Sequence, residues 1–504
     1  MIIVTSTTVV RHVILLGLTI TIELSRKNLT KAKGQVADSR NLSIRDLLAV
    51  QAAFIKKGGG NLNDVSLSVA TVSRHRRQNR EEISNQVREK FVKPSFVLIH
   101  WDSKLIRYLT GKKDERVAIL ISGKPTLEHP KFLGIPVIKD STGTSKHNAV
   151  IKLLDEWEVT KNVVGMVFDA TASNTGRWKG CATSIESTLD RAVLWLACRH
   201  HMYELHVKHV AEEIVGERNS PSESLFDLEL FDYNVCTEMQ EIANEVVIWG
   251  ENHLEKETFP REDYRELLEL TVLFLGGTVY PFKFRKPGAH HHARFMAYFY
   301  LLLSFLRKIM PTFIAVFHSR AFLRSRLSSI APSMDLKYLT DMNIYAKEDT
   351  EAAAVAIKSV LNHLWYLTEE AVVFAIFDKE LPVTLRQEMV KKLYSMPQPQ
   401  RFVPQKPIFP RIDPSNEVDF SEQLLSCICP RSWLLFDLLQ VLIYWDKMIG
   451  YQNVEKQILS MEVVNDCAER GVKLVTDFKD MSKDEKEQQY LFQVIEDYRN
   501  RVQT

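Results

Sequence analysis

The sequence predicts an α/β core joined to a long all-helical region, with a small helical module in front of the core. Short apolar runs that end in turn residues alternate with helical patterns over residues 93–215, which is typical of an α/β sheet. Over residues 216–458 the apolar residues recur at helical spacing, with few strand-like runs. Short helical patterns, the last of them basic, precede the core between residues 39 and 92.

Length and composition fit a globular protein of several domains. The chain has 504 residues and is 45% hydrophobic and 25% charged, which is enough for about two to four domains. The net charge is only +2, so an acidic partner must be bound by local basic patches. The six cysteines lack the spacing of a disulfide framework, which favours a reducing, intracellular setting.

Residues 1–38 are expected to form a leader and a linker. The apolar stretch from Ile2 to Leu24 is interrupted by Arg11 and His12. It therefore has no uninterrupted run of about 18 apolar residues and predicts no membrane span. Its charges also stand in the wrong order for a signal peptide, with secretion kept as the alternative. We expect a strand-like or poorly ordered segment here, followed by a basic linker.

Residues 39–92 are expected to form a helical module that resembles a helix-turn-helix. Ser43 caps a helix that runs to about Lys57, and Ser68 caps a second, basic helix. In such modules the last helix enters the DNA major groove. The residues expected to contact the DNA backbone are Arg74, Arg76, Arg77 and Arg80. The alternative is that these arginines only solvate the end of a helix.

The first part of the core, residues 93–215, carries five strand-like runs and two helical patterns. Strands are expected at residues 95–102, 116–123, 135–138, 163–168 and 192–198, with helices at 144–159 and 177–190. The order β-β-β-α-β-α-β is that of the RNase H-like fold. Residues 459–504 are expected to return after the helical insertion, residues 216–458, and to complete this core.

Two carboxylates end two of these strands. Asp102 ends the first and Asp169 ends the fourth, and these strands are neighbours in the RNase H-like fold. Adjacent carboxylates repel each other unless a divalent cation binds between them, and Mg²⁺ or Mn²⁺ prefers such hard oxygen ligands. With a third acid, the set suits an in-line displacement on phosphate. The alternative for each residue alone is a turn former or a helix cap.

Several segments resemble motifs of hAT-type transposases, in the same order along the chain. Residues 168–174 resemble the family's Asp-Asn-Ala-Ser-Asn segment, and residues 195–201 resemble its Cys-x-x-His segment. Residues 460–472 are similar to its Ser-x-x-x-Glu-Arg-x-Phe helix, and residues 293–295 faintly resemble its Thr-Arg-Trp segment. The resemblance covers about residues 95–480.

The resemblance implies a third metal ligand near the C-terminus, and Glu469 is our choice. Apolar residues around Glu469 recur at helical spacing, so its helix is expected to pack on the sheet with Glu469 beside the apolar stripe. The alternative is a solvated pair of Glu469 with Lys473. Rival third acids are Glu462 and Asp466 on the same helix, and Glu204 after the last strand.

The resemblance also implies roles for three residues outside the acid set. Cys198 and His201 are expected to position DNA or brace the active site, although a cysteine on an apolar strand is usually part of the core. Arg294 follows a run of three histidines and is expected to reach a DNA phosphate. The alternative for this segment is a polar helix start.

The sequence as a whole predicts a transposase-like protein that cleaves DNA with Mg²⁺ or Mn²⁺ and transfers strands, with Asp102, Asp169 and Glu469 as metal ligands. DNA, as transposon ends and target, is the expected partner of a nuclear homo-oligomer with no membrane partner. Departures from the family at Ala170 and Gly471 keep two alternatives open. One is a catalytically inactive, host-retained DNA-binding or scaffold protein, and the other is an RNase H-like nuclease without strand transfer.

Overall fold

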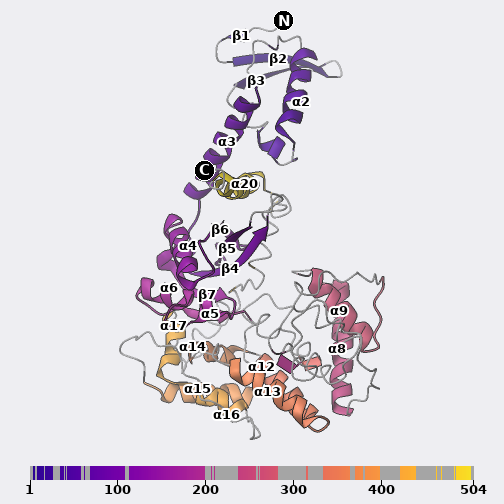
Figure 1. Ribbon diagram of the computed structural model, residues 1–504, viewed down its shortest axis with the longest axis vertical. Coiled ribbons are helices and arrows are strands. Elements are labelled where there is room, and N and C mark those ends of the chain that lie inside the picture. Colours follow the sequence, from indigo (N-terminus) through magenta and orange to yellow (C-terminus); the bar gives the residue numbers. More distant parts are fainter. Residues whose placement is uncertain are drawn as a thin grey trace.

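The computed structural model describes most of the N-terminal module and central sheet, and parts of the helical region. The described residues are 4–5, 8–15, 18–25, 34–38, 40, 42–57, 62, 68–107, 113–176, 178–198, 206, 209–210, 237–256, 259, 262–281, 314–315, 333–363, 369–378, 381–397, 420–438, 461, 467, 471, 482 and 484–500. They form an elongated molecule, with the N-terminal module at one end, the central sheet in the middle and the helical region at the other end (Figure 1).

A small antiparallel sheet begins the chain. Its strands are β1 (Val4–Thr5), β2 (Thr8–Leu15) and β3 (Leu18–Ser25), paired in that order. The sequence predicted a strand-like or poorly ordered leader here, and the structure has the strand-like form. In the described part of the chain, no helix has the length and apolar character needed to cross a membrane.

Two helices follow, and both begin where the sequence predicted a cap. α2 (Ile44–Lys57) and α3 (Val69–Glu89) start directly after Ser43 and Ser68. Each serine hydroxyl accepts a hydrogen bond, 3.1 Å long, from the backbone N–H three residues ahead. These bonds satisfy N–H groups that have no partner within the helix, which is why serine favours this position. The small core of the module contains Ala37, Leu47 and Val72.

A five-stranded mixed sheet forms the middle of the molecule. Its strands are β4 (Val97–Arg107), β5 (Lys113–Ser122), β6 (Lys131–Gly134), β7 (Val163–Phe168) and β8 (Leu194–Ala197), in the order β6-β5-β4-β7-β8. β6, β5 and β4 are antiparallel, whereas β4, β7 and β8 are parallel. The helices α4 (Gly143–Glu156) and α6 (Cys181–Leu189) make the connections to β7 and β8. The predicted order of elements and the mixed α/β class are confirmed.

The third strand lies earlier in the chain than predicted. Residues 135–138 were expected to form it, but β6 ends at Gly134. Beyond that point an isolated bridge between Arg116 and Val137 continues the pairing. Pro136 carries no backbone N–H, so it cannot donate to a continuous ladder.

The helix predicted at residues 177–190 is also shorter at its N-terminal end. The chain instead forms α5 (Ala172–Thr175), a loop, and then α6. The backbone N–H of Gly180 donates to the carbonyl oxygen of Gly176 at 2.9 Å, which closes the loop. A Cβ atom on Gly180 would lie 2.5 Å from that oxygen, so the turn requires glycine at this position.

The sheet separates two hydrophobic cores. Successive side chains of a strand point to opposite faces. Ile99 and Trp101 therefore pack in the core that contains α4 and α6, whereas Leu98 packs in the core that contains the helical region. β7 and β8 are buried along their whole length, as expected for parallel strands covered on both faces.

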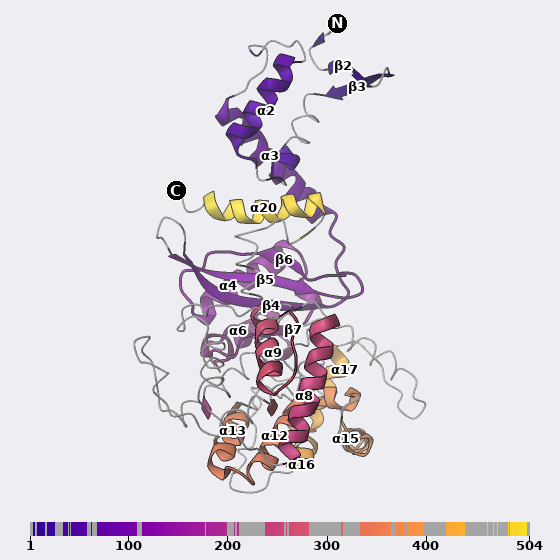
Figure 2. The same cartoon turned by 90° about the vertical axis from the view of Figure 1, so that its right-hand side faces the viewer.

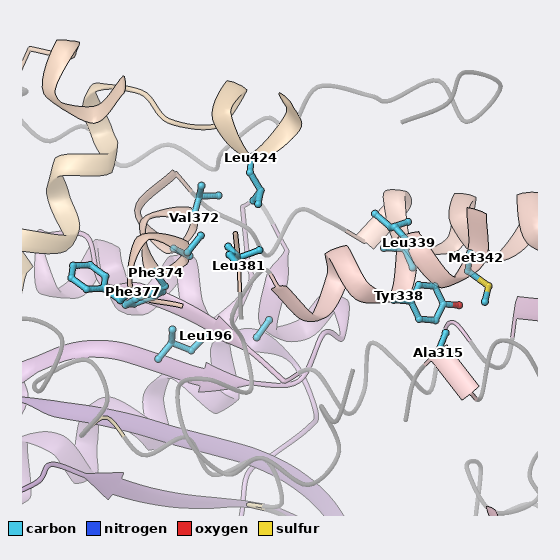
Figure 3. Packing of buried hydrophobic residues seen from close by; sticks show 14 of the residues in the cluster. Leu196, Ala315, Tyr338, Leu339, Met342, Val372, Phe374, Phe377, Leu381 and Leu424 are labelled. Carbon is cyan, nitrogen blue, oxygen red and sulfur yellow. The ribbon is translucent and has the colours of Figure 1, made fainter. Parts of the chain in front are cut away.

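The helical region covers one face of the sheet. Its elements are α8 (Thr237–Lys256), α9 (Glu262–Phe274), α12 (Ser333–Tyr345), α13 (Thr350–His363), α14 (Glu369–Val372), η7 (Val373–Phe377), α15 (Val383–Ser395), α16 (Phe420–Ser426), η8 (Pro430–Trp433) and α17 (Leu434–Leu438). Leu196 of β8 lies beside Phe374 and Phe377 of η7 in the shared core (Figure 3). The sequence predicted an all-helical region over residues 216–458, and the elements that the structure describes in this range are helices.

The C-terminal helix joins the N-terminal module to the sheet. Figure 2 shows α20 (Glu485–Asn500) lying between α3 and the sheet. On the sheet side, the buried Tyr490 hydroxyl contacts the carbonyl oxygens of Phe132 and Leu133 at 2.8 and 3.1 Å. On the other side, the Arg80 guanidinium stacks 4.3 Å from the ring centre of Phe492. The module is therefore attached to the core by packing and not only by the chain.

Candidate active site on the central strands

Asp102 and Asp169 belong to the two neighbouring strands at the centre of the sheet. β4 continues to Arg107, so the prediction that Asp102 ends the first strand was wrong and Asp102 lies inside it, whereas Asp169 directly follows β7. β4 and β7 are parallel, and His100 is the partner of Val167, two residues before each acid. Extending this register by two residues places Asp102 level with Asp169. Residues level with each other on adjacent strands share a face, so both carboxylates belong to the face that carries the helical region. The prediction that these two strands are neighbours is confirmed by the strand order.

Two more residues continue this row across the sheet. Ala118 of β5 is the partner of Asp102. On the other side, Phe168 pairs with Ala197, and the next residue, Cys198, donates its backbone N–H to the Phe168 oxygen at 2.8 Å. Cys198 is only 7% exposed. A thiol that is buried in this way favours support of the active site over direct contact with DNA, the two roles that the sequence suggested for Cys198.

The C-terminal segment returns to the same row. The Cys467 thiol donates to the carbonyl oxygen of Ala118 at 3.2 Å. A Cβ atom on Gly471 would lie 2.7 Å from the Ala118 Cβ, so the segment approaches β5 closely. The chain therefore returns beside the residue that is paired with Asp102. The predicted third acid, Glu469, and its rivals Glu204, Glu462 and Asp466 lie outside the described residues.

The Asp169 carboxylate is held by a compact hydrogen-bond network. Its Oδ1 atom accepts from the Thr171 backbone N–H at 2.9 Å, from the Thr171 hydroxyl at 2.6 Å and from Asn174 Nδ2 at 2.6 Å. Asn174 in turn accepts a hydrogen bond from Trp101 Nε1 at 2.9 Å through its own Oδ1. Asp169 therefore is the turn former that the sequence offered as its alternative role. The same turn fixes the orientation of the Asp169 carboxylate.

A buried lysine supports this network from α4. Lys146 is 2% exposed, and its Nζ donates to the Ser173 hydroxyl at 2.9 Å. Ser173 and Thr171 share a hydrogen bond 3.0 Å long. The approach of α4 needs a glycine, because a Cβ atom on Gly143 would lie 2.2 Å from the Lys179 carbonyl oxygen. The network around Asp169 thus depends on contacts between α4 and residues 169–180, which are separate segments of the sequence.

The acid pair has the ligand chemistry that a divalent cation requires. Mg²⁺ and Mn²⁺ bind carboxylate oxygens, and Asp102 and Asp169 are level on one face of the sheet. Among the described residues, the Asp169 Oδ2 atom accepts no hydrogen bond, so it is available to a cation. The described residues contain no group of three or more histidine, cysteine or acidic side chains that could hold a metal ion. Asp102 and Asp169 are the two predicted ligands whose positions the structure describes, and their carboxylates have the chemistry that such a cation prefers.

The basic residues predicted to contact DNA divide into two groups. Arg74 and Arg77 are exposed on α3. Arg76 and Arg80 instead bind the buried carboxylate of Asp38, with Arg76 Nε at 2.9 Å and Arg80 Nη1 at 3.2 Å from its Oδ1. This pairing was not predictable from the sequence, because Asp38 precedes Arg76 and Arg80 by 38 and 42 residues. The predicted positions His201 and Arg294 lie outside the described residues.

An exposed tryptophan that follows the Asp169 turn in the chain was missed in the sequence. Trp178 is 81% exposed, and it lies in the loop that Gly176 and Gly180 close directly after the Asp169 network. Lys179 next to it is also exposed. The available signal was the Gly-x-Trp-Lys-Gly pattern, which combines a tight turn with an aromatic and a basic side chain.

A second group of charged residues lies where the sheet meets the helical region. Burial raises the pKa of Glu186 on α6 to about 7, and the nearby Glu370 carboxylate raises it further. A hydrogen bond from the Val193 backbone N–H, 3.1 Å long, opposes this increase. The indole of Trp195 and the charge of Arg431 also lower the pKa. Glu186 therefore changes its charge near neutral pH.

We expect stability to depend on pH through Glu186. Because its folded-state pKa of about 7 lies above the unfolded value of 4.5, its contribution is fully present below about pH 4.5. The contribution is lost as the pH rises through 7, which lowers the free energy of unfolding by about 3 kcal/mol. Thermal unfolding of Glu186→Gln should vary less with pH between 5 and 8 than that of the wild type. Glu156→Gln, at an exposed site, should keep the wild-type profile.

Comparison with models of known protein families and with curated proteins gave no match to this chain.

Proposed function

We propose that this chain is a transposase-like enzyme that cleaves phosphodiester bonds in DNA and transfers strands, using Asp102 and Asp169 in an RNase H-like core. One observation carries the proposal. Two acids from distant parts of the chain lie level on adjacent parallel strands and share one face of the sheet. Carboxylates that are close together repel each other, and their pairing at the centre of a sheet favours a cation-binding role.

The strand order supports the assignment to an RNase H-like core. The sheet has three antiparallel strands followed by two parallel strands, and β4 lies in the middle next to both β5 and β7. The acids come from β4 and from the residue after β7, as the resemblance to hAT-type transposases implies. The helical region between β8 and the C-terminal segment also has the place of the family's helical insertion.

A divalent cation bound here would activate the attacking oxygen and stabilise the leaving oxygen of an in-line displacement. Asp102 and Asp169 would hold it, and the Asp169 network would keep that carboxylate from rotating. We assign the third ligand to Glu469. The contacts of Cys467 and Gly471 with Ala118, the partner of Asp102, support this assignment.

The exposed residues near the acids favour a nucleic acid as the substrate. Trp178 offers an aromatic face and Lys179 a positive charge, beside the turn that holds Asp169. Aromatic faces stack on unpaired bases, and lysines neutralise phosphates. Arg74 and Arg77 on α3 provide a separate exposed basic surface for duplex DNA.

We expect Trp178→Ala to weaken binding of a single-stranded oligonucleotide by about tenfold, because one stacking contact is lost. Fluorescence anisotropy with a labelled oligonucleotide at low salt measures this affinity. Tyr280→Ala is the matched control, since Tyr280 is an exposed aromatic residue in the helical region. Equal affinities for Trp178→Ala and Tyr280→Ala would remove Trp178 from the proposed DNA-binding surface.

The proposed reaction is tested with the full-length protein on a supercoiled plasmid and a branched duplex. We expect cleavage with Mg²⁺ or Mn²⁺ at low salt, and its loss in a chelator. Joining of the cleaved ends to a second DNA separates a transposase from a nuclease without strand transfer. DNA binding without cleavage under either cation would contradict the proposal and favour the inactive, host-retained DNA-binding protein.

A further inference from the structure

We infer that Asn174 is a positioning residue that sets the relative placement of the two acid-bearing strands and the orientation of the Asp169 carboxylate. This inference rests on the proposed cation-binding role of Asp102 and Asp169. Asn174 itself would not touch the cation or the DNA. It would act through the two residues that it contacts.

Asn174 connects both acid-bearing strands with a single side chain. It is 0% exposed, and its Oδ1 atom accepts a hydrogen bond from the indole of Trp101 at 2.9 Å. Its Nδ2 atom donates to Asp169 Oδ1 at 2.6 Å. Trp101 immediately precedes Asp102 in β4, and its ring stacks on Phe168, the residue before Asp169, at 5.0 Å. The amide therefore bridges the two strands within one residue of each acid.

The network occupies one oxygen of Asp169 and leaves the other. Oδ1 accepts three hydrogen bonds of 2.6 to 2.9 Å. An oxygen that already accepts three donors has no remaining lone-pair direction for a metal ion. Oδ2, which has no hydrogen-bond partner among the described residues, is then the oxygen that would bind a cation. Asn174 contributes one of the three donors that hold the carboxylate in this orientation.

A chain of hydrogen bonds from Lys146 through Ser173 and Thr171 also ends on Asp169, so Thr171 helps to orient the carboxylate as Asn174 does. The Lys146 ammonium can only donate, so Ser173 accepts from it and directs its own proton to Thr171. Thr171 then directs its hydroxyl proton to Asp169 Oδ1. This chain of donors ends on the same oxygen that Asn174 contacts. Such outer hydrogen bonds typically change metal affinity by about 10- to 100-fold when removed.

Asn162 provides a matched structural control. It lies in the 3-10 turn η2 (Thr160–Asn162), and its Nδ2 atom donates to the carbonyl oxygen of Pro94 at 2.8 Å. It therefore links the start of β7 to the segment before β4, at the opposite end from the acids. Asn162→Ala should loosen the same two strands without changing the contacts of Asp169.

The test measures Mn²⁺ binding to the full-length protein by calorimetry, together with thermal unfolding in the absence of metal. We expect Asn174→Ala to weaken Mn²⁺ binding by about tenfold or more, whereas Asn162→Ala should stay within about twofold of the wild type. Thr171→Val is the second variant, because it removes the hydroxyl donor but keeps the side-chain shape and the backbone N–H. It should weaken binding in the same direction, and it carries the test if Asn174→Ala does not fold.

Asp169→Asn separates failure of the inference from failure of the proposed function. If Asp169→Asn binds Mn²⁺ as the wild type does, the proposed cation site fails and the inference fails with it. If Asp169→Asn loses binding while Asn174→Ala and Thr171→Val keep the wild-type affinity, only the positioning role is overturned. Equal weakening by Asn174→Ala and Asn162→Ala would reduce Asn174 to a structural residue.

Discussion

Asp169→Asn is expected to reduce metal-dependent DNA cleavage by on the order of 10³-fold, and Asp102→Asn is expected to do the same. Asparagine keeps the size of the side chain but removes the charge that a divalent cation requires. The replacement can also place an N–H donor where the network around Asp169 presents only donors. Single-turnover cleavage of a branched duplex in Mn²⁺ measures the loss.

Two further variants serve as controls in this cleavage experiment. The variant with both replacements should be no slower than either single variant, because the two acids act as one unit. Asp190→Asn should keep the wild-type rate, because Asp190 caps α6 with a left-handed φ of 50°, a conformation that asparagine also adopts. Cleavage that survives Asp102→Asn or Asp169→Asn would show that the activity resides elsewhere.

Asp38→Asn is expected to destabilise the N-terminal module by about 3 kcal/mol. Asp38 is buried, and it is the carboxylate that binds both Arg76 and Arg80. Without its charge, two largely buried guanidinium groups lose their counter-ion. Hydrogen exchange of α2 and α3 measures the local free energy of opening, and these helices should exchange faster in the variant.

The matched control is the ion pair of Lys93 with Glu158, which lies on the surface. Glu158→Gln should leave the stability nearly unchanged, because exposed pairs are screened by water and salt. Unchanged exchange of α2 and α3 in Asp38→Asn would mean that the module does not depend on this network.

Local elements were predictable because their signals act over only a few residues. The serine caps at Ser43 and Ser68 each bond to an N–H three residues ahead, so the starts of α2 and α3 agree with the sequence. The apolar run that precedes Asp169 is likewise β7. The errors were also local. Pro136 limited the third strand, and the turn closed by Gly180 shortened a predicted helix.

The partners of charged residues were not predictable, because they come from distant segments. The sequence predicted that Arg76 and Arg80 belong to a basic helix that contacts DNA, because nothing near them in the sequence indicates that Asp38 is their partner. The sequence placed Trp178 in a predicted helix. Its exposure depends on the loop that the hydrogen bond between Gly176 and Gly180 closes. The sequence pattern of a helix or strand indicates which residues can be exposed. The packing of neighbouring elements decides which of these residues are exposed in the folded protein.

The sequence by itself determined the order of strands and helices, the caps of the N-terminal helices and the presence of two acids that follow apolar runs. Periodicity and capping are properties of short segments, so they can be read without the rest of the chain. Only the tertiary structure decided that Asp102 and Asp169 are level on one face, and that Asn174 bridges their strands. Register and side-chain contacts depend on how distant segments pack, and that packing minimises exposed apolar surface over the whole molecule.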